Sequence, residues 1–197
     1  LSIYGRDASC DEAQCPIAAQ NDGLQAIETG SHLEFDGVDD YLTVPNVLNP
    51  ATTDFTAALW FRLYSLKANY LLQQADGSGT GRTWLYLNND GSLRSFLGGS
   101  DLVHPTKARD TEWHHAALTY HQATQTLTLY LDGVPVSATR ALEGSDGAML
   151  VGTSKSFTNN FHGNIDEVAL FDRALTATEI GYLGQSPWHD ASPVYVG

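Results

Sequence analysis

The chain has 197 residues, of which 10 are basic and 23 acidic, so its formal net charge is −13 at neutral pH. This charge repels phosphate backbones and anionic membrane surfaces, which argues against nucleic acid as a partner. Hydrophobic residues make up 42% of the chain and glycine contributes 18 residues, a composition typical of a packed, turn-rich domain rather than a disordered chain. The longest apolar runs are shorter than the roughly 20 residues that a membrane span needs, so we expect no membrane insertion. The length suits one all-β domain with a single core.

Residues 1–30 are predicted to be a polar, loop-like segment packed on that domain. Cys10 and Cys15 are the only cysteines of the chain, and no His or further Cys stands nearby to complete a zinc site. We therefore expect a local disulfide, which implies an oxidising, extracellular setting. The alternative is a pair of free thiols in a cytosolic protein.

The segment HLEFDGVDDY, residues 32–41, predicts a short strand, an acid-rich glycine turn and the start of a second strand. A later segment, GNIDEVALFDRAL at 163–175, predicts a strand in which Asp166 shares a face with Val168 and Leu170. A lone carboxylate on an apolar face is costly unless a partner or a metal neutralises it. Two such segments, more than a hundred residues apart, indicate that the two ends of the chain meet in space.

Strict alternation predicts a strand at 55–63. One face carries Phe55, Ala57, Leu59, Phe61 and Leu63, while the other carries Thr56, Trp60, Arg62 and Tyr64. Residues 83–97 predict a hairpin around Asn89-Asp90-Gly91. Its core face is predicted to hold Leu85, Leu87, Leu93 and Leu97, and its outer face Trp84, Tyr86, Arg94 and Phe96. We expect Trp60 and Trp113 to belong to the core.

Further strands are predicted at 113–120, 148–152 and 161–171, and TLTLYLDGVPVSA reads as a hairpin with Asp132-Gly133 at its turn. Thr176 followed by Glu179 forms a capping box that predicts one short C-terminal helical turn. Residues 185–197 carry two prolines and are interpreted as a strap or linker. The predicted fold is an all-β antiparallel sandwich over residues 31–184.

Four blocks together resemble the laminin G-like, concanavalin A-like lectin/glucanase jelly-roll family: FDGVDDYLTVP at 35–45, FTAALWFRL at 55–63, residues 113–136, and GNIDEVALFDRALTATEI at 163–180. The resemblance implies two antiparallel sheets, a module of a larger secreted or cell-surface protein, and commonly a calcium ion at the sheet edge. Carried onto this sequence, it points to a Ca²⁺ site formed by Asp36, Gly37, Asp39, Asp40 and Asp166. These oxygen donors suit calcium. The alternative is that the early aspartates only cap a turn and Asp166 accepts backbone hydrogen bonds.

Enzymes also occur on this fold, but glycoside hydrolases need two carboxylates that flank one bond. The nearest pair is Asp166 and Glu167, and neighbours on a regular strand point to opposite faces. His114 and His115 face opposite ways for the same reason, and we expect one of them to be satisfied by a hydrogen bond in the core. The sequence contains neither a GxSxG elbow nor an HExxH helix. We therefore predict that the chain is not an enzyme.

Sugar rings stack on Trp and Tyr, while amide, carboxylate and guanidinium groups bond their hydroxyls. On that basis the predicted ligand-binding residues lie on the polar face of the hairpin and at its rim, which includes the loop at 156–160: Gln73, Arg82, Trp84, Tyr86, Asn88 and Arg94. The predicted function is a non-catalytic, extracellular, calcium-binding module for carbohydrate binding or adhesion. The alternative is a purely structural or protein-binding module without a sugar site.

Overall fold

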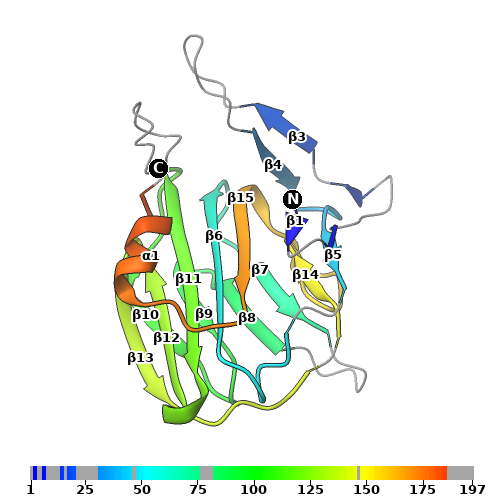
Figure 1. The fold of residues 1–197 in the computed structure, drawn as a ribbon. Coiled ribbons are helices and arrows are strands. Elements are labelled where there is room, and N and C mark those ends of the chain that lie inside the picture. Colours follow the sequence, from blue (N-terminus) through cyan, green and yellow to red (C-terminus); the bar gives the residue numbers. More distant parts are fainter. Residues whose placement is uncertain are drawn as a thin grey trace, which may run out of the picture.

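The computed structural model describes residues 2–3, 6–7, 14–15, 17–20, 31–45, 48–75, 82–145 and 147–185. Two antiparallel sheets lie face to face in it (Figure 1). The six-stranded sheet has the order β10 (Leu102–Lys107), β9 (Ser92–Ser95), β8 (Arg82–Leu87), β7 (Asn69–Gln74), β14 (Met149–Val151) and β5 (Leu42–Val44). The seven-stranded sheet has the order β13 (Val134–Thr139), β12 (Thr126–Leu131), β11 (Trp113–His121), β6 (Phe55–Leu63), β15 (His162–Phe171), β4 (Ser31–Asp36) and β3 (Ile17–Gln20). The predicted antiparallel sandwich is confirmed.

The early and late segments of the chain pair directly. β4 lies antiparallel to β15, with His162 opposite Asp36 and Ile165 opposite Leu33. β3 adds to the other edge of β4, so part of the segment predicted as loop extends the large sheet instead. The two-residue strands β1 (Ser2–Ile3) and β2 (Arg6–Asp7) pair with each other. Cys10 lies outside the described residues, so the Cys10–Cys15 disulfide stays a prediction, as does the role of residues 186–197.

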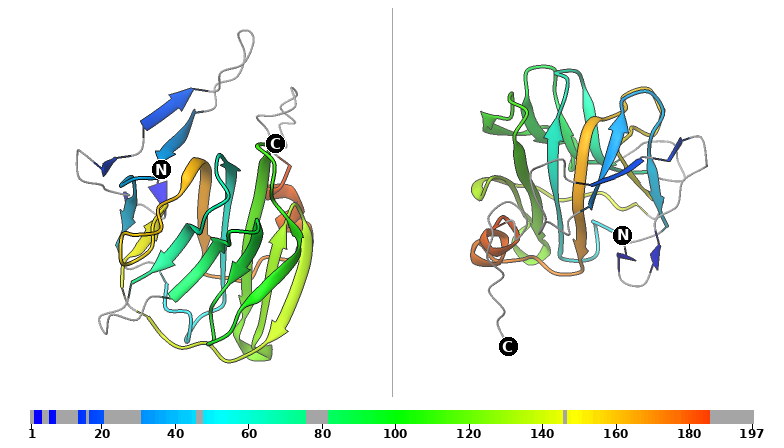
Figure 2. Two further views of the ribbon diagram at one scale, coloured as in Figure 1. Left: turned by 180° about the vertical axis from the view of Figure 1, so that it is seen from behind. Right: turned by 90° about the horizontal axis from the view of Figure 1, so that it is seen from above.

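One core fills the space between the two sheets. β6 follows the predicted alternation, because all five residues of its apolar face are buried there: Phe55, Ala57, Leu59, Phe61 and Leu63. A smaller apolar cluster lies on the outer face of the large sheet, where Ala58, Ala117 and Tyr130 pack against Leu175 and Ile180. The helix α1 (Ala177–Leu183) thereby covers one part of that face, as Figure 1 and the right view of Figure 2 show. Trp60 and Trp113, predicted as core residues, are both half-buried on the same face.

The predicted helix start is confirmed at atomic detail. The Thr176 side chain accepts from the Glu179 backbone N–H, and the Glu179 side chain accepts from the Thr176 backbone N–H, which together form the capping box. The α1 helix is short, and within the described residues no helix is long and apolar enough to cross a membrane. A 3-10 turn at Gln122–Thr124 joins β11 to β12.

A β-bulge overturns the predicted face of Asp166. The register between β15 and β6 shifts between Asp166 and Ala169, and Glu167 adopts a positive φ of 48°. Asp166 therefore lies opposite Trp60 on the outer face, whereas Val168 and Leu170 point into the core. Asp166 was predicted to share their face because strict alternation was assumed, and one inserted residue reverses that assignment.

A second pair of irregularities changes the face of Trp84. The register between β7 and β8 shifts on both sides of the pair Leu72 and Leu85. Trp84 is consequently fully buried beside Leu85, and its ring packs on Phe55 with centroids 4.4 Å apart. The predicted outward orientation of Trp84 is wrong, because the bulge turns two consecutive side chains toward the core.

Candidate functional site

An acid-rich turn at residues 36–40 joins β4 to β5. Gly37 has φ +76°, a conformation that favours glycine and allows the sharp reversal. The Oδ1 atom of Asp36 accepts from the backbone N–H of Val38 at 2.7 Å, and Oδ2 of Asp40 accepts from the backbone N–H of Asp36 at 2.8 Å. These bonds fix the two carboxylates toward the inside of the turn, where Asp40 is buried.

Contacts from distant segments hold the same turn from outside. The Lys67 Nζ donates to the Gly37 carbonyl at 2.8 Å, and the Asn160 side-chain amide donates to the Val38 carbonyl. A Cβ atom added at Gly37 would lie 2.7 Å from the Cβ of His162, so the strand β15 also limits the space. The conformation of the turn therefore depends on three segments far apart in the sequence.

The carboxylates of Asp36, Asp39 and Asp40 converge, each offering one oxygen within 4.8 Å of the others. Calcium binds oxygen at about 2.3–2.6 Å, so oxygens spaced in this way fit around one ion. Burial, followed by the negative charges of Asp36 and Asp39, raises the pKa of Asp40. A cation between the three groups would relieve that repulsion, and the donor set is therefore suited to calcium.

Asp166 is not part of this group. His162 is the residue of β15 that lies opposite Asp36, and Asp166 is four residues further along the strand. At about 3.3 Å per residue, the separation along β15 is about 13 Å. Asp166 is half-buried opposite Trp60, and Glu167 donates its backbone N–H to Asp166 Oδ1 at 2.8 Å. The structure thus brings together four of the five predicted metal residues. Asp36, Asp39 and Asp40 contribute carboxylates, and Gly37 lies in the same turn.

A pocket of about 360 Å³ adjoins the acidic turn, lined by Gln14, Asp39, Tyr41, Phe157 and Asn160. The rings of Tyr41 and Phe157 lie 5.0 Å apart, and the Tyr41 hydroxyl donates to Gln14 Oε1 at 3.1 Å. Phe157 is 52% exposed and adopts a positive φ of 55°. Phe157 and Asn160 belong to the loop that was predicted as a rim, but they border the acidic turn. Sequence reasoning missed Gln14 and Tyr41, since their contact joins segments that no short pattern connects.

The predicted ligand residues on the hairpin separate into two groups. Trp84 and Gln73 are buried, and Gln73 Nε2 donates to the Thr83 hydroxyl at 2.8 Å. Arg82 is ion-paired with Glu143 at 2.9 Å, and Asn88 is half-buried in the turn between β8 and β9. Of this first group, Trp84 is unavailable as a stacking platform because its ring lies in the core.

Tyr86 and Arg94 do come together. They face each other across β8 and β9, and both bond Asp101, at 2.7 Å from the tyrosine hydroxyl and 2.9 Å from the guanidinium. Tyr70 stacks on Tyr86 with centroids 5.5 Å apart. Burial, followed by the hydrogen bond to Asp101, raises the pKa of Tyr86. These half-buried groups satisfy one another, so they form a fixed outer surface of the small sheet.

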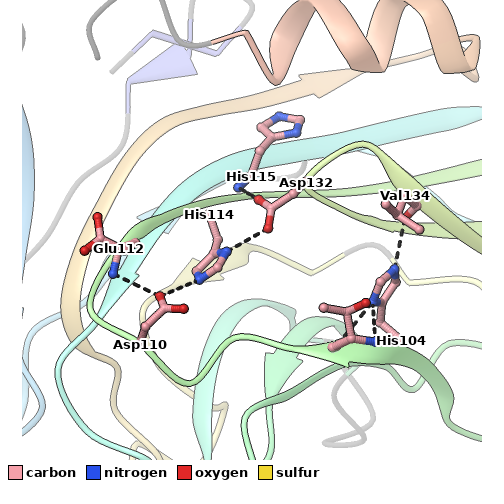
Figure 3. A network of polar contacts seen from close by, with 8 residues as sticks. His104, Asp110, Glu112, His114, His115, Asp132 and Val134 are labelled. Carbon is pink, nitrogen blue, oxygen red and sulfur yellow. Dashed lines mark hydrogen bonds and ion pairs between the residues drawn. The ribbon is translucent and has the colours of Figure 1, made fainter. Parts of the chain in front are cut away.

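A histidine network lies at the start of β11 (Figure 3), and sequence reasoning did not connect its two aspartates, Asp110 and Asp132, with His114. His114 Nδ1 lies 2.7 Å from Asp132 Oδ2, and its Nε2 lies 2.9 Å from Asp110 Oδ1. The hydrogen bond to Asp132 raises the pKa of His114, whereas burial lowers the pKa of His115 to about 4. His114 and His115 face opposite sides, as predicted, and His114 is satisfied by hydrogen bonds, but to two exposed aspartates rather than within the core. With both ring nitrogens held by carboxylates, His114 is a structural bridge.

A laminin G-type family model, described as the concanavalin A-like lectin/glucanases superfamily, matches residues 36–181. The chain belongs to this superfamily. The match spans the acidic turn, the whole six-stranded sheet, the strands β6, β11, β12, β13 and β15 of the seven-stranded sheet and most of α1, so the resemblance seen in the four sequence blocks is confirmed. No curated protein sequence matches the chain.

Solved structures similar to this superfamily member come from several settings. Domain 4 of AbnA, a GH43 extracellular arabinanase from Geobacillus stearothermophilus solved with arabinotriose, is 20% identical, with TM-score 0.62 and 85% of this chain and 86% of that chain covered. A heptameric SAP-like pentraxin from Limulus polyphemus is 14% identical, with TM-score 0.59 and coverages of 77% and 80%. A putative carbohydrate binding protein from Bacteroides ovatus is 18% identical, with TM-score 0.62 and coverages of 79% and 47%. At these identities the likeness shows the fold.

Proposed function

We propose that this chain is a non-catalytic carbohydrate-binding module whose ligand binds at the pocket beside the acidic turn. The observation that carries the proposal is that a group of carboxylates suited to a cation adjoins a pocket lined by aromatic rings and amides. Of the three convergent carboxylates, Asp39 also lines a pocket whose walls combine the Tyr41 and Phe157 rings with the amides of Gln14 and Asn160. Aromatic rings stack on sugar faces, and amides and carboxylates bond hydroxyl groups.

Calcium is the proposed ion of the acidic turn. Asp36, Asp39 and Asp40 would hold it, and the ion would neutralise the charge concentrated around the buried Asp40. Asp39 lies both in the carboxylate group and in the pocket wall, so it links the two. A bound ion would therefore position Asp39 for contact with the ligand.

The absence of catalysis is part of the proposal. The bulge at Asp166 removes the strict alternation on which the sequence argument against the Asp166 and Glu167 pair was based. Support comes instead from the pocket lining, which holds one carboxylate, that of Asp39, whereas a glycosidase needs two carboxyl groups on either side of the scissile bond. The other two carboxylates of the acidic turn, Asp36 and Asp40, accept hydrogen bonds from backbone N–H groups of the turn itself.

The proposal also includes the location of the protein. The chain would be part of a larger secreted protein, and its partner would be a carbohydrate or an extracellular glycoprotein. The arabinanase domain supports this setting, because it belongs to an extracellular enzyme and was solved with arabinotriose. The predicted Cys10–Cys15 disulfide would also support secretion, since disulfides persist in oxidising compartments. Thiol labelling of the denatured, unreduced chain tests this bond, and two reactive thiols would remove the support that it gives.

The test is calorimetric titration of the calcium-loaded chain with arabinotriose and with other neutral and acidic oligosaccharides. We expect binding by at least one sugar, about tenfold weaker in Phe157→Ala, because a stacking ring is lost. Phe96→Ala is the matched control, since Phe96 is 47% exposed and is not one of the residues that line the pocket. Equal affinity in both variants, or new reducing ends released on incubation with polysaccharides, contradicts the proposed function.

A further inference from the structure

The loop at residues 152–160 joins β14 to β15 and carries the Phe157 wall of the pocket, and we name it the Phe157 loop. It begins at Gly152, which has φ +82° and where an added Cβ atom would collide with the Phe35 ring. It closes where the Phe161 backbone N–H donates to the Gly152 carbonyl at 2.7 Å. The two ends of the loop are therefore held together at its base.

Hydrogen bonds within the Phe157 loop fix its conformation. The Ser154 hydroxyl accepts from the Asn159 backbone N–H at 3.3 Å, and the Phe157 N–H donates to the Ser154 carbonyl at 2.8 Å. The Lys155 backbone N–H donates to Oε1 of the buried Gln73 at 2.5 Å, which anchors the loop on β7. Phe157 has a positive φ of 55°, which residues other than glycine seldom adopt, so the orientation of its ring depends on these contacts.

Asn160 joins the base of the Phe157 loop to the acidic turn. It is 7% exposed, its side-chain amide donates to the Val38 carbonyl, and its Oδ1 atom accepts from the Thr153 hydroxyl. Thr153 is fully buried. Val38 lies between two of the convergent carboxylates, and its own N–H donates to Asp36 Oδ1 at 2.7 Å. A continuous chain of hydrogen bonds therefore leads from the carboxylates through Asn160 to the loop.

We propose that Asn160 is a positioning residue that couples the acidic turn to the Phe157 loop, so that a cation in the turn strengthens sugar binding in the pocket. Without an ion, the three carboxylates, whose oxygens lie within 4.8 Å of one another, repel and favour a looser turn. A bound cation removes this repulsion and fixes the Val38 peptide, whose carbonyl holds Asn160. Asn160 in turn holds Thr153 at the base of the loop, which keeps the Phe157 ring against Tyr41.

The inference rests on the proposed function, because it concerns the regulation of the same pocket. Coupling between two ligands is reciprocal, so the ion and the sugar strengthen each other's binding by the same factor, for which we expect about tenfold. Asp39 carries part of this factor, since it both belongs to the carboxylate group and lines the pocket. The part carried by Asn160 is removed by a change at Thr153, which is neither one of the carboxylates nor a residue of the pocket lining.

Hydrogen exchange tests the coupling without any sugar. The amides of residues 154–160 are followed by mass spectrometry in the full chain, in calcium and in EDTA. Calcium should slow their exchange about tenfold in the parent. Thr153→Val keeps the shape of the side chain but removes the hydroxyl, so it should abolish the slowing while calcium still raises the melting temperature. Thr153→Ser retains the hydroxyl and should restore the slowing.

Thr56→Val is the matched control for a general loss of stability. Thr56 is also fully buried, but its hydroxyl donates to the Arg173 carbonyl at 2.8 Å, close to the start of α1. This variant should unfold more easily than the parent and still show the calcium-dependent slowing at 154–160. Calorimetric titration with arabinotriose in calcium and in EDTA completes the test. The ratio of the two affinities should be kept in Thr153→Ser and should fall in Thr153→Val.

The outcomes separate the coupling from the proposed function. Calcium that stabilises the parent but leaves exchange at 154–160 unchanged, or slows it equally in Thr153→Val, overturns the coupling through Asn160, while the pocket and its ion stand. Slowing that depends on the Thr153 hydroxyl, together with no binding of any tested sugar, supports the coupling and removes the carbohydrate ligand. If calcium changes neither the melting temperature nor the exchange, both the ion and the coupling are wrong.

Discussion

Strands β6 and β11 pair without a register shift from Phe55 to Arg62, whereas β15 and β8 are interrupted by bulges. In the regular pair, every second residue of β6 is buried between the sheets. In the bulged strands, one extra residue moves Asp166 outward and Trp84 inward. The difference shows that a bulge can move a polar or aromatic residue to the face opposite the one that strict alternation predicts. Such residues are also the usual candidates for a functional site, so the bulges affect the site prediction most.

The largest expected effect tests Trp84. Trp84→Ala should destabilise the domain by about 3–5 kcal/mol, because it leaves a cavity beside Phe55 in the main core. Trp113→Ala removes an equal side chain from the regular strand β11, but from its half-buried outer face, and should cost clearly less. Urea unfolding of both variants provides the comparison. Equal losses would mean that the bulge does not place Trp84 in the core.

The next effect concerns calcium and the position of Asp166. An ion that binds only the folded state adds about 2.7 kcal/mol at a hundredfold excess over its dissociation constant. For a domain of this size that corresponds to about 5–10 °C in melting temperature, which chelation should remove. Asp39→Asn should weaken the calcium response, and Asp166→Asn, across the bulge, should retain it. A response lost in Asp166→Asn would show that Asp166 reaches the acidic turn after all.

The two histidines of β11 test the regular strand through opposite pH dependences. The bond to Asp132 raises the pKa of His114 above its ordinary 6.5, so its stabilisation is complete below about pH 6.5 and is lost as the pH rises through the raised pKa. Burial lowers the pKa of His115 to about 4, so its contribution is present above about pH 6.5 and is lost as the pH falls toward 4.

Melting temperatures between pH 4 and 9 measure both effects. The deficit of His114→Gln relative to the parent should shrink as the pH rises, and the deficit of His115→Leu should shrink as the pH falls below 6.5. Differences of a few degrees are expected. Curves that stay parallel to the parent at every pH would contradict the opposite environments of the two rings.

The smallest effect lies at the bulge itself. Glu167 has φ +48°, which glycine adopts more easily than alanine, so Glu167→Gly should be more stable than Glu167→Ala by about 1 kcal/mol. At Ser137, an exposed residue in the regular strand β13, the order should reverse, because glycine weakens an ordinary strand by about 0.5–1 kcal/mol. The four variants are compared by thermal unfolding. The same order at both positions would mean that the backbone at Glu167 is ordinary.

The fold was largely predictable, because alternation at 55–63 and the Asp132-Gly133 turn are local signals. The site was predictable in part. Asp36, Asp39 and Asp40 are close in sequence, so their convergence needed no long-range information. The pocket was not predictable, since Gln14, Tyr41 and Phe157 meet only through tertiary contacts. Bulges leave little trace in a single sequence, which explains the errors at Trp84 and Asp166.

The central position of β6 has a consequence for synthesis of the chain. β6 ends at Leu63, but its two neighbours are β11 and β15, and β15 is complete only at Phe171. At about 5–20 residues per second, a ribosome needs on the order of 5–20 s to make the intervening residues. During that interval an apolar strand, FTAALWFRL, has no permanent partner on one edge. We expect the nascent chain to aggregate or to require a chaperone until its last strand emerges.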